Sequence, residues 1–344
     1  MTDSVIHIFD PHATASTSDG TTRTHPHSIS DSAAVLSELA SSDSNNVCCL
    51  VSAGMLPDSD TLATATDELI SSNATIGILP VAGHADLAFA WSRLPAAIAS
   101  FVTPPESRGA VLLNASRLHN APSKEVDRPV QELVIRTALQ NQDSVVLTGS
   151  SATLNASPLP AVATELPDLA PQRPRSRRKW IVNLLKQLSP AEYLSGEGDS
   201  CEAEAILAGL LQLNNFLDES HNHSQSIQGQ GQDVNGDYWH GIMHRREPDY
   251  GNAKYWCRRV GSHPCFQQLP ELAQQAFDEC PSSDAAHWKS RLAGESGWDA
   301  AAFVDLCEAT ERSSDDDLTT AAKRIQWAEM LILLEHTYRQ ASGQ

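Results

Sequence analysis

A run of five prolines in the middle of the chain does most to restrict how it can fold. The residues are Pro158, Pro160, Pro167, Pro171 and Pro174. Proline has no backbone N–H and fixes φ, so this density excludes a continuous helix or a central strand. We expect residues 158–178, a Pro/Arg-rich stretch, to link a domain at 1–157 to a domain at 179–344. A chain of 344 residues is long enough for two domains.

The first half of the chain alternates short apolar runs with segments of helical spacing. Strands are predicted at residues 5–9, 46–51, 76–81, 108–114 and 144–147, helices at 32–40, 62–70 and 130–139, and a loop at 13–30. This alternation is typical of an α/β domain with a mostly parallel sheet. The sequence contains no GxGxxG motif and no P-loop, which argues against dinucleotide and nucleotide sites of those types.

The stretch from about residue 47 to 149 reads VCCLV, MLPDSDTLATATDELI, RGAVLLNASRL and RPVQELVIRTALQNQDSVVLTG in order. These pieces resemble the later half of a family-2-type glycosyltransferase domain. The resemblance implies a truncated A-type fold, the fold of nucleotide-diphospho-sugar transferases, with a metal-binding acidic dyad after the first strand and a catalytic base on the last helix.

The acidic residues that this resemblance implies are missing. Ser52–Gly54 stand in place of the metal dyad, and Pro129 and Val130 in place of the base. Without them nothing neutralises a diphosphate leaving group or deprotonates an acceptor. Asp58, Asp60 and Asp127 could substitute for them, but they fit better as helix caps and surface residues. We therefore expect a glycosyltransferase-like scaffold that lacks transferase activity.

The second half has helical spacing throughout, which predicts an all-α domain. The periodic segments are 180–188, 202–217, 269–277, 285–292, 300–307 and 318–338. No apolar stretch approaches the roughly 20 residues that span a bilayer, and the first twenty residues show no signal-peptide pattern. Seven cysteines without a CxxC pair fit a reducing compartment. These features favour a cytoplasmic protein.

The charge of the chain restricts its partners. It has 43 acidic residues against 24 Lys and Arg, a net charge of -19. Such a body repels phosphate backbones and anionic membranes, so we expect neither as a partner. A small anionic ligand in a local cationic pocket is compatible with this charge, and the sequence leaves the oligomeric state open.

Residues 218–264 are rich in His, Arg and aromatic side chains, which can bind ligands or metals, and include five of the twelve Trp and Tyr residues. Arg forks bind phosphate or carboxylate, and aromatic faces stack on sugars or bases. The candidate ligand-binding cations are Arg245, Arg246, Lys254, Arg258 and Arg259, and the candidate stacking residues are Tyr238, Trp239, Tyr255 and Trp256. The first hypothesis is therefore a site for a small anionic or sugar-like ligand.

A metal site is the alternative for the same stretch. His240 and His244 are four residues apart, and Glu247 follows three residues later, so all three can share one helical face. Two imidazoles and a carboxylate can hold a divalent metal with open positions. His221 and His223 are expected in a loop, and 225–236 in a Gln/Gly-rich loop. HExxH is absent, so zincin chemistry has no support.

A third reading makes these residues structural, with the aromatic side chains in a core and the protein serving as a non-catalytic interaction partner. The runs LDESHNHSQSI, GDYWHGIMHRREPDYGNAKYW and RRVGSHP resemble an uncharacterised hypothetical-protein family over roughly residues 192–269. That resemblance implies no known reaction. The sequence thus leaves open whether the protein is an enzyme, and its candidate cofactor is a divalent metal.

The missing transferase dyad leads to a first prediction. Adding a nucleotide sugar to protein already saturated with Mn²⁺ should leave the melting temperature unchanged, because Ser52–Gly54 offer no carboxylate for a metal–diphosphate complex. A ligand specific for the native state at a hundredfold excess over its Kd stabilises by about 2.7 kcal/mol. A clear upward shift over Mn²⁺ alone would show that another acid has replaced the dyad.

Overall fold

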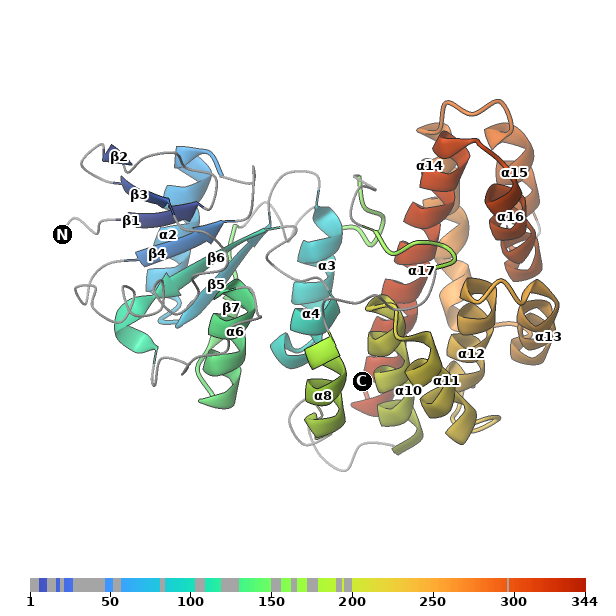
Figure 1. Ribbon diagram of the computed structural model, residues 1–344, viewed down its shortest axis with the longest axis horizontal. Helices are drawn as coiled ribbons and strands as arrows, with labels where there is room; N and C mark the ends of the chain where they lie inside the picture. The colour runs from blue at the N-terminus through green and yellow to red at the C-terminus, as the bar shows by residue number, and fades with distance from the viewer. Residues whose placement is uncertain are drawn as a thin grey trace. The chain divides into compact units, whose positions relative to one another are not determined.

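The computed structural model describes two compact units, Met1–Ser157 and Pro158–Gln344 (Figure 1). The described residues are 6–10, 17–18, 22–26, 47–51, 57–80, 84–102, 109–118, 130–149, 156–161, 166–171, 179–189, 194, 200–295 and 297–344. The expected helix at 32–40, as well as Ser52–Gly54, Asp127 and Pro129, lies outside them.

The first unit is built on a seven-stranded sheet in the order β2-β3-β1-β4-β6-β5-β7. Its strands are β1 (Ile6–Asp10), β2 (Thr17–Ser18), β3 (Thr22–Pro26), β4 (Val47–Val51), β5 (Ile76–Pro80), β6 (Gly109–Asn114) and β7 (Val145–Leu147). Strands β2 and β3 lie within the segment expected to be a loop.

The sheet is mixed, and the expectation of a mostly parallel sheet was wrong. Strand β6 enters between β4 and β5 and runs antiparallel to both, whereas β1 is parallel to β3 and β4, and β5 is parallel to β7. The sequence pattern does not reveal strand direction. A strand that is buried on both faces is a continuous apolar run whether it pairs parallel or antiparallel to its neighbours.

Helices α2 (Ser59–Ser71), α3 (Ala85–Arg93), α4 (Ala96–Val102) and α6 (Val130–Gln140) accompany the sheet. All five residues of β4 are buried, and its core side chains lie in one cluster with Leu62, Ala65 and Leu69 of α2. Asp58 caps α2, with its carboxylate accepting from the Thr61 N–H at 2.9 Å. The structure thus gives this acid a capping role.

The described part of the second unit is helical apart from a short hairpin with two residues in each strand. Its helices are α8 (Lys179–Gln187), α10 (Ser200–Leu213), α11 (Leu217–Ser226), α12 (Asn235–Arg246), α13 (Tyr250–Val260), α14 (Leu269–Asp278), α15 (Ala285–Leu292), α16 (Ala300–Arg312) and α17 (Asp316–Ala341). Strands β8 (Ala293–Gly294) and β9 (Gly297–Trp298) form the hairpin. Helix α11 occupies the position where a loop with His221 and His223 was expected.

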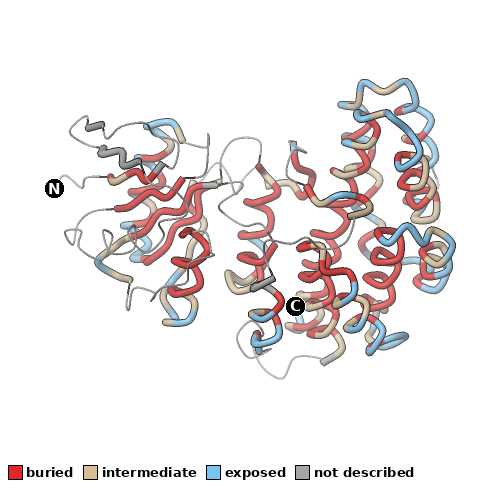
Figure 2. Tube along the Cα trace, viewed as in Figure 1, coloured by how far each residue is buried: buried red, intermediate tan, exposed pale blue. Residues whose placement is uncertain are grey.

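The longest helix, α17, is buried along most of its length (Figure 2). It packs against α10, α14 and α16. Besides its apolar residues it buries Arg324, Gln326 and Glu329. Each of these polar side chains has a hydrogen-bond partner, as burial requires.

The described part of the expected linker is packed into the second unit. Leu159, Leu166 and Leu169 are buried between the prolines. Arg324 Nε donates to the Pro160 carbonyl at 2.6 Å, and Lys323 pairs with Asp168 at 2.6 Å. Residues 158–161 and 166–171 are therefore anchored, because proline excludes regular hydrogen-bonded elements without preventing side-chain burial or the acceptance of hydrogen bonds by carbonyls.

This anchoring leads to a second prediction. Arg324→Ala should release the Pro160 segment and accelerate proteinase K cleavage at residues 158–161, because Arg324 binds both that carbonyl and Glu279 (2.7 Å). Mass spectrometry of limited digests measures the cleavage. The control is Arg312→Ala, which removes an arginine with a 74% exposed side chain that pairs with Glu308 on the same helix. Equal cleavage rates at 158–161 in both variants would contradict the anchoring.

Candidate functional site

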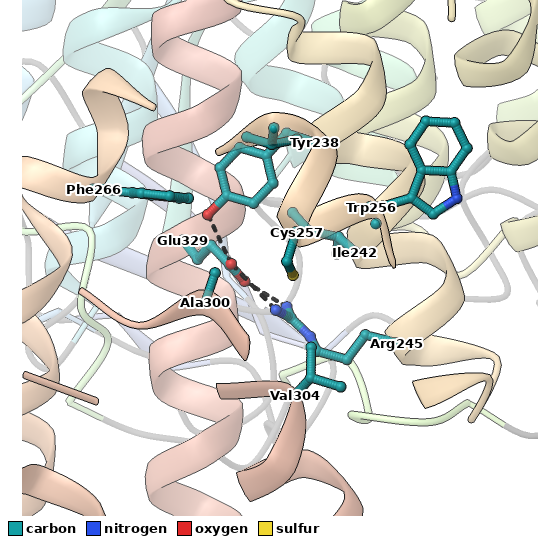
Figure 3. Close-up of a pocket in the computed structure, with 11 residues that line it drawn as sticks. Tyr238, Ile242, Arg245, Trp256, Cys257, Phe266, Ala300, Val304 and Glu329 are labelled. Carbon is teal, nitrogen blue, oxygen red and sulfur yellow. Dashed lines mark hydrogen bonds and ion pairs between the residues drawn. The ribbon is translucent and has the colours of Figure 1, made fainter. Parts of the chain in front are cut away.

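A small cavity lies beside Tyr238 and Arg245 in the interior of the second unit (Figure 3). Its volume is about 10 Å³, room for about one water molecule. The Tyr238 hydroxyl donates to Glu329 at 2.8 Å, and Arg245 forms an ion pair with the same carboxylate. This cavity is too small for a sugar or an organic anion, so Tyr238 and Arg245 serve the core.

The other candidate cations do not converge on one pocket. Arg246 is fully buried and donates to the Gln212 carbonyl and to Asn215. The remaining three lie on α13: Lys254 pairs with Asp305 at 2.5 Å, Arg259 pairs with Asp237 at 3.1 Å, and Arg258 is exposed. The predicted cationic site is thus not assembled: Lys254 and Arg259 pair with acidic residues of the same unit, and Arg246 is used by a backbone carbonyl and an amide.

The aromatic side chains do not form a stacking surface either. Trp239 is fully buried, and a Cβ built on Gly209 would lie 2.5 Å from its ring, which shows how closely α10 and α12 approach. Tyr255 is exposed, whereas Trp256 is buried and stacks on His240 with ring centroids 4.0 Å apart. Sequence spacing placed these rings near one another but could not show that they face different surroundings.

Three histidines converge where α11 and α12 pack together. His221 from α11 and His240 and His244 from α12 each offer a ring nitrogen, and these nitrogens lie within 4.8 Å of one another. His240 and His244 stack with ring centroids 4.8 Å apart, and His221 meets His240 edge-on at 4.7 Å. Among the described residues, these three histidines form the cluster whose geometry could hold a metal ion.

The sequence-based trio differs from this cluster in one member. Glu247 lies outside it, with its carboxylate 3.6 Å from Nδ1 of His244. Helix α12 ends at Arg246, and Glu247 follows as a C-cap with φ -89° and ψ 18°, so it leaves the helical face. His221 takes its place. The overlooked signal is the pair Asp218 and Glu219, acids suited to the first turn of a helix that then carries His221.

Burial of the two α12 histidines, His240 and His244, favours their uncharged form. Burial, with smaller contributions from His244 and His221, lowers the pKa of His240 to about 3. Burial likewise lowers the pKa of His244, although Asp249 opposes this shift. Metals bind the neutral imidazole, so the ligands need not lose a proton at neutral pH.

The hydrogen bonds of the cluster are incomplete. His240 is only 3% exposed, and its Nδ1 is buried without a hydrogen-bond partner. His244 has the Asn252 amide nitrogen 3.0 Å from its Nε2. A buried polar atom without a partner raises the free energy of the fold unless something satisfies it. A metal ion at this point would do so.

Comparisons with known proteins do not assign a family. No protein-family model, no curated protein and no solved structure matches the chain. Across the described segments, none of the helices combines the length and apolar character needed to cross a membrane. What the protein does is therefore inferred from the geometry of the second unit.

The shifted histidine leads to a third prediction, for the metal-free protein. An unfolded chain binds a proton at His240 near pH 6.5, whereas the folded site binds it only near pH 3. Acidification therefore favours unfolding, and the stability present above pH 6.5 is lost as the pH falls, by at most about 1.4 kcal/mol per pH unit for this group. The melting temperature should fall between pH 7.5 and pH 5.

His240→Gln should flatten this dependence, whereas His287→Gln, which replaces an exposed histidine, should leave it unchanged. Thermal melts at half-unit pH intervals measure the difference. An equally steep decline in the His240 variant would rule out the buried, uncharged state of that imidazole.

Proposed function

We propose that the second unit binds a divalent transition metal through His221, His240 and His244. The observation that carries the proposal is the convergence of three ring nitrogens within 4.8 Å. Ligand nitrogens at the tetrahedral corners around zinc lie about 3.3 Å apart, given Zn–N distances of about 2.0–2.1 Å. Small side-chain rotations would bring the three imidazoles to that spacing.

The donor set favours certain metals. Imidazole nitrogens suit zinc, copper, iron and nickel, whereas calcium and magnesium prefer oxygen ligands. Three protein ligands leave a coordination position for water or substrate, the arrangement of catalytic rather than structural zinc. A metal bound there would supply an activated water near neutral pH. The reaction class that fits is thus metal-assisted hydrolysis or hydration.

Residues around the three ligands have supporting roles in this proposal. Glu247, 3.6 Å from Nδ1 of His244, would need a small shift to accept a hydrogen bond from that nitrogen, and a metal at Nε2 would displace the Asn252 amide, which lies 3.0 Å from it. Trp256 covers one face of His240 and holds its ring in place. Burial raises the pKa of Glu247, while nearby His221 opposes the shift.

Metal content provides the fourth prediction. The purified protein should carry one equivalent of zinc or a similar metal, and His244→Ala should lose most of it because two ligands rarely hold a metal tightly. Plasma mass spectrometry measures the stoichiometry, and added Zn²⁺ should raise the melting temperature of the parent protein but not that of His244→Ala.

His223→Ala is the matched control. His223 lies two residues after His221 on α11 but pairs with Glu204 at 2.6 Å, outside the cluster. It should retain the metal. The proposal fails if the folded parent protein takes up no metal, or if the two variants lose it equally.

We also propose that the first unit is a glycosyltransferase-like scaffold of the A type. Support comes from the elements that carry the sequence resemblance, because β4, β6, β5 and β7 are consecutive neighbours in one sheet. Asp58 is engaged as a helix cap, which fits a scaffold without a working metal dyad. The cytoplasmic location stays a prediction.

A further inference from the structure

A second, larger cavity opens at the C-terminal end of α17, away from the three histidines. Its volume is about 520 Å³, within the range of small-ligand sites. The residues that line it are Glu202, Gln232, Asp233, His336, Arg339, Gln340, Gly343 and Gln344. Three parts of the chain therefore build it: the start of α10, the turn before α12 and the end of α17.

The carboxylate of Glu202 is fixed in the wall of this cavity. Its Oε2 accepts from the Asn235 amide at 2.7 Å, and the same amide donates to Gln340 Oε1 at 2.7 Å. The Asn235 carbonyl lies 3.0 Å from Nε2 of His263, whose Nδ1 accepts from the Cys265 N–H. Asn235 is fully buried, and both hydrogens of its amide are engaged, so it holds Glu202 in place.

Asp233 is the second fixed carboxylate. One of its oxygens, Oδ2, lies 2.8 Å from Nε2 of His336 and also accepts from the Gln340 amide. The next residue, Val234, has φ 48° and ψ 43°, a left-handed conformation that costs energy for a β-branched side chain. Such strain persists where the surroundings impose it, often at functional sites. Here it lies between Asp233 and Asn235, the two residues that shape the wall.

The charges indicate which ligands suit the cavity. The lining contains two carboxylate side chains, those of Glu202 and Asp233, and one arginine, Arg339. The side chain of Arg339 is 57% exposed and lies 3.8 Å from Glu335. The chain as a whole carries a net charge of -19, which draws cations towards acidic concave surfaces and repels anions. No Phe, Tyr or Trp side chain of the described segments lines the cavity, and its one ring, the imidazole of His336, is paired with Asp233. Among the described residues, the grouping suited to a metal ion is the histidine cluster.

We propose that this cavity binds a small organic cation with several N–H donors, such as a polyamine, with ammonium groups held by Glu202 and Asp233. Anchored carboxylates accept charge-assisted hydrogen bonds from ammonium groups, which are stronger than neutral ones. Gln232 supplies a further amide group in the lining. This site is independent of the histidine cluster, so either proposal can fail without the other.

Isothermal titration of the full chain with spermidine tests the proposal. Spermidine should bind with one-to-one stoichiometry, and Asp233→Asn and Glu202→Gln should each weaken it about tenfold or more, since a hydrogen bond to a charged group is lost. Asp278→Asn is the matched control, because that carboxylate is 64% exposed and pairs with Lys289 outside the cavity. Tetramethylammonium, a monocation with no N–H donor, should bind much more weakly.

Arg339→Gln keeps the test decisive if the carboxylate variants unfold. Removing this exposed cation should tighten spermidine binding about twofold, the size expected for an exposed charge. Absence of spermidine binding to the folded parent protein would overturn the proposal. So would equal affinities in the Asp233, Asp278 and Arg339 variants, or equal affinity for tetramethylammonium, because these results would indicate non-specific attraction to an acidic protein.

Discussion

The buried ion pair between Arg245 and Glu329 is the interaction on which the second unit depends. Arg245 is on α12 and Glu329 on α17, and their side chains are 4% and 1% exposed. The Tyr238 hydroxyl donates to the same carboxylate, and the Arg245 guanidinium lies over Phe303. The attraction of Glu329 raises the pKa of Arg245 against the effect of burial, so the guanidinium stays charged. Removing either partner of such a pair leaves an uncompensated buried charge, at a cost of about 3–5 kcal/mol.

This pair fixes the rotation of α12, and the rotation decides what every other side chain of the helix faces. With Tyr238 and Arg245 committed to α17, His240 and His244 are presented to α11, where His221 meets them. The first residue of the helix, Asn235, reaches Glu202 on α10 and Gln340 on α17. Every residue of α12 is buried, so the helix has no free face. Helix α12 therefore carries two of the three clustered histidines and, through Asn235, holds the Glu202 wall of the second cavity.

The sequence went far in locating this element and less far in assigning roles to its residues. Helical spacing anticipated most helices of the second unit, and the density of His, Arg and aromatic residues pointed to residues 218–264. The arginines were misjudged because a cation for a ligand and a cation for an internal carboxylate look alike in sequence. Arg245 pairs with Glu329, 84 residues away, a distance over which residue spacing carries no information. The prolines near residue 160 gave no sign of their packing for a related reason, since only the fold shows that Arg324 binds the Pro160 carbonyl.

By itself, the sequence determined most of the segments that become helices and strands, and that His240 and His244 share a face, because these properties depend on residues a few positions apart. It also fixed the acidic charge of the whole molecule. Only the tertiary structure decided the antiparallel direction of β6 and the replacement of Glu247 by His221 as third neighbour of the two histidines. It also decided the meeting of Glu202, Asp233 and His336 around one cavity. These outcomes depend on which elements pack together, and that is set by the burial of apolar surface over the whole unit rather than by any local pattern.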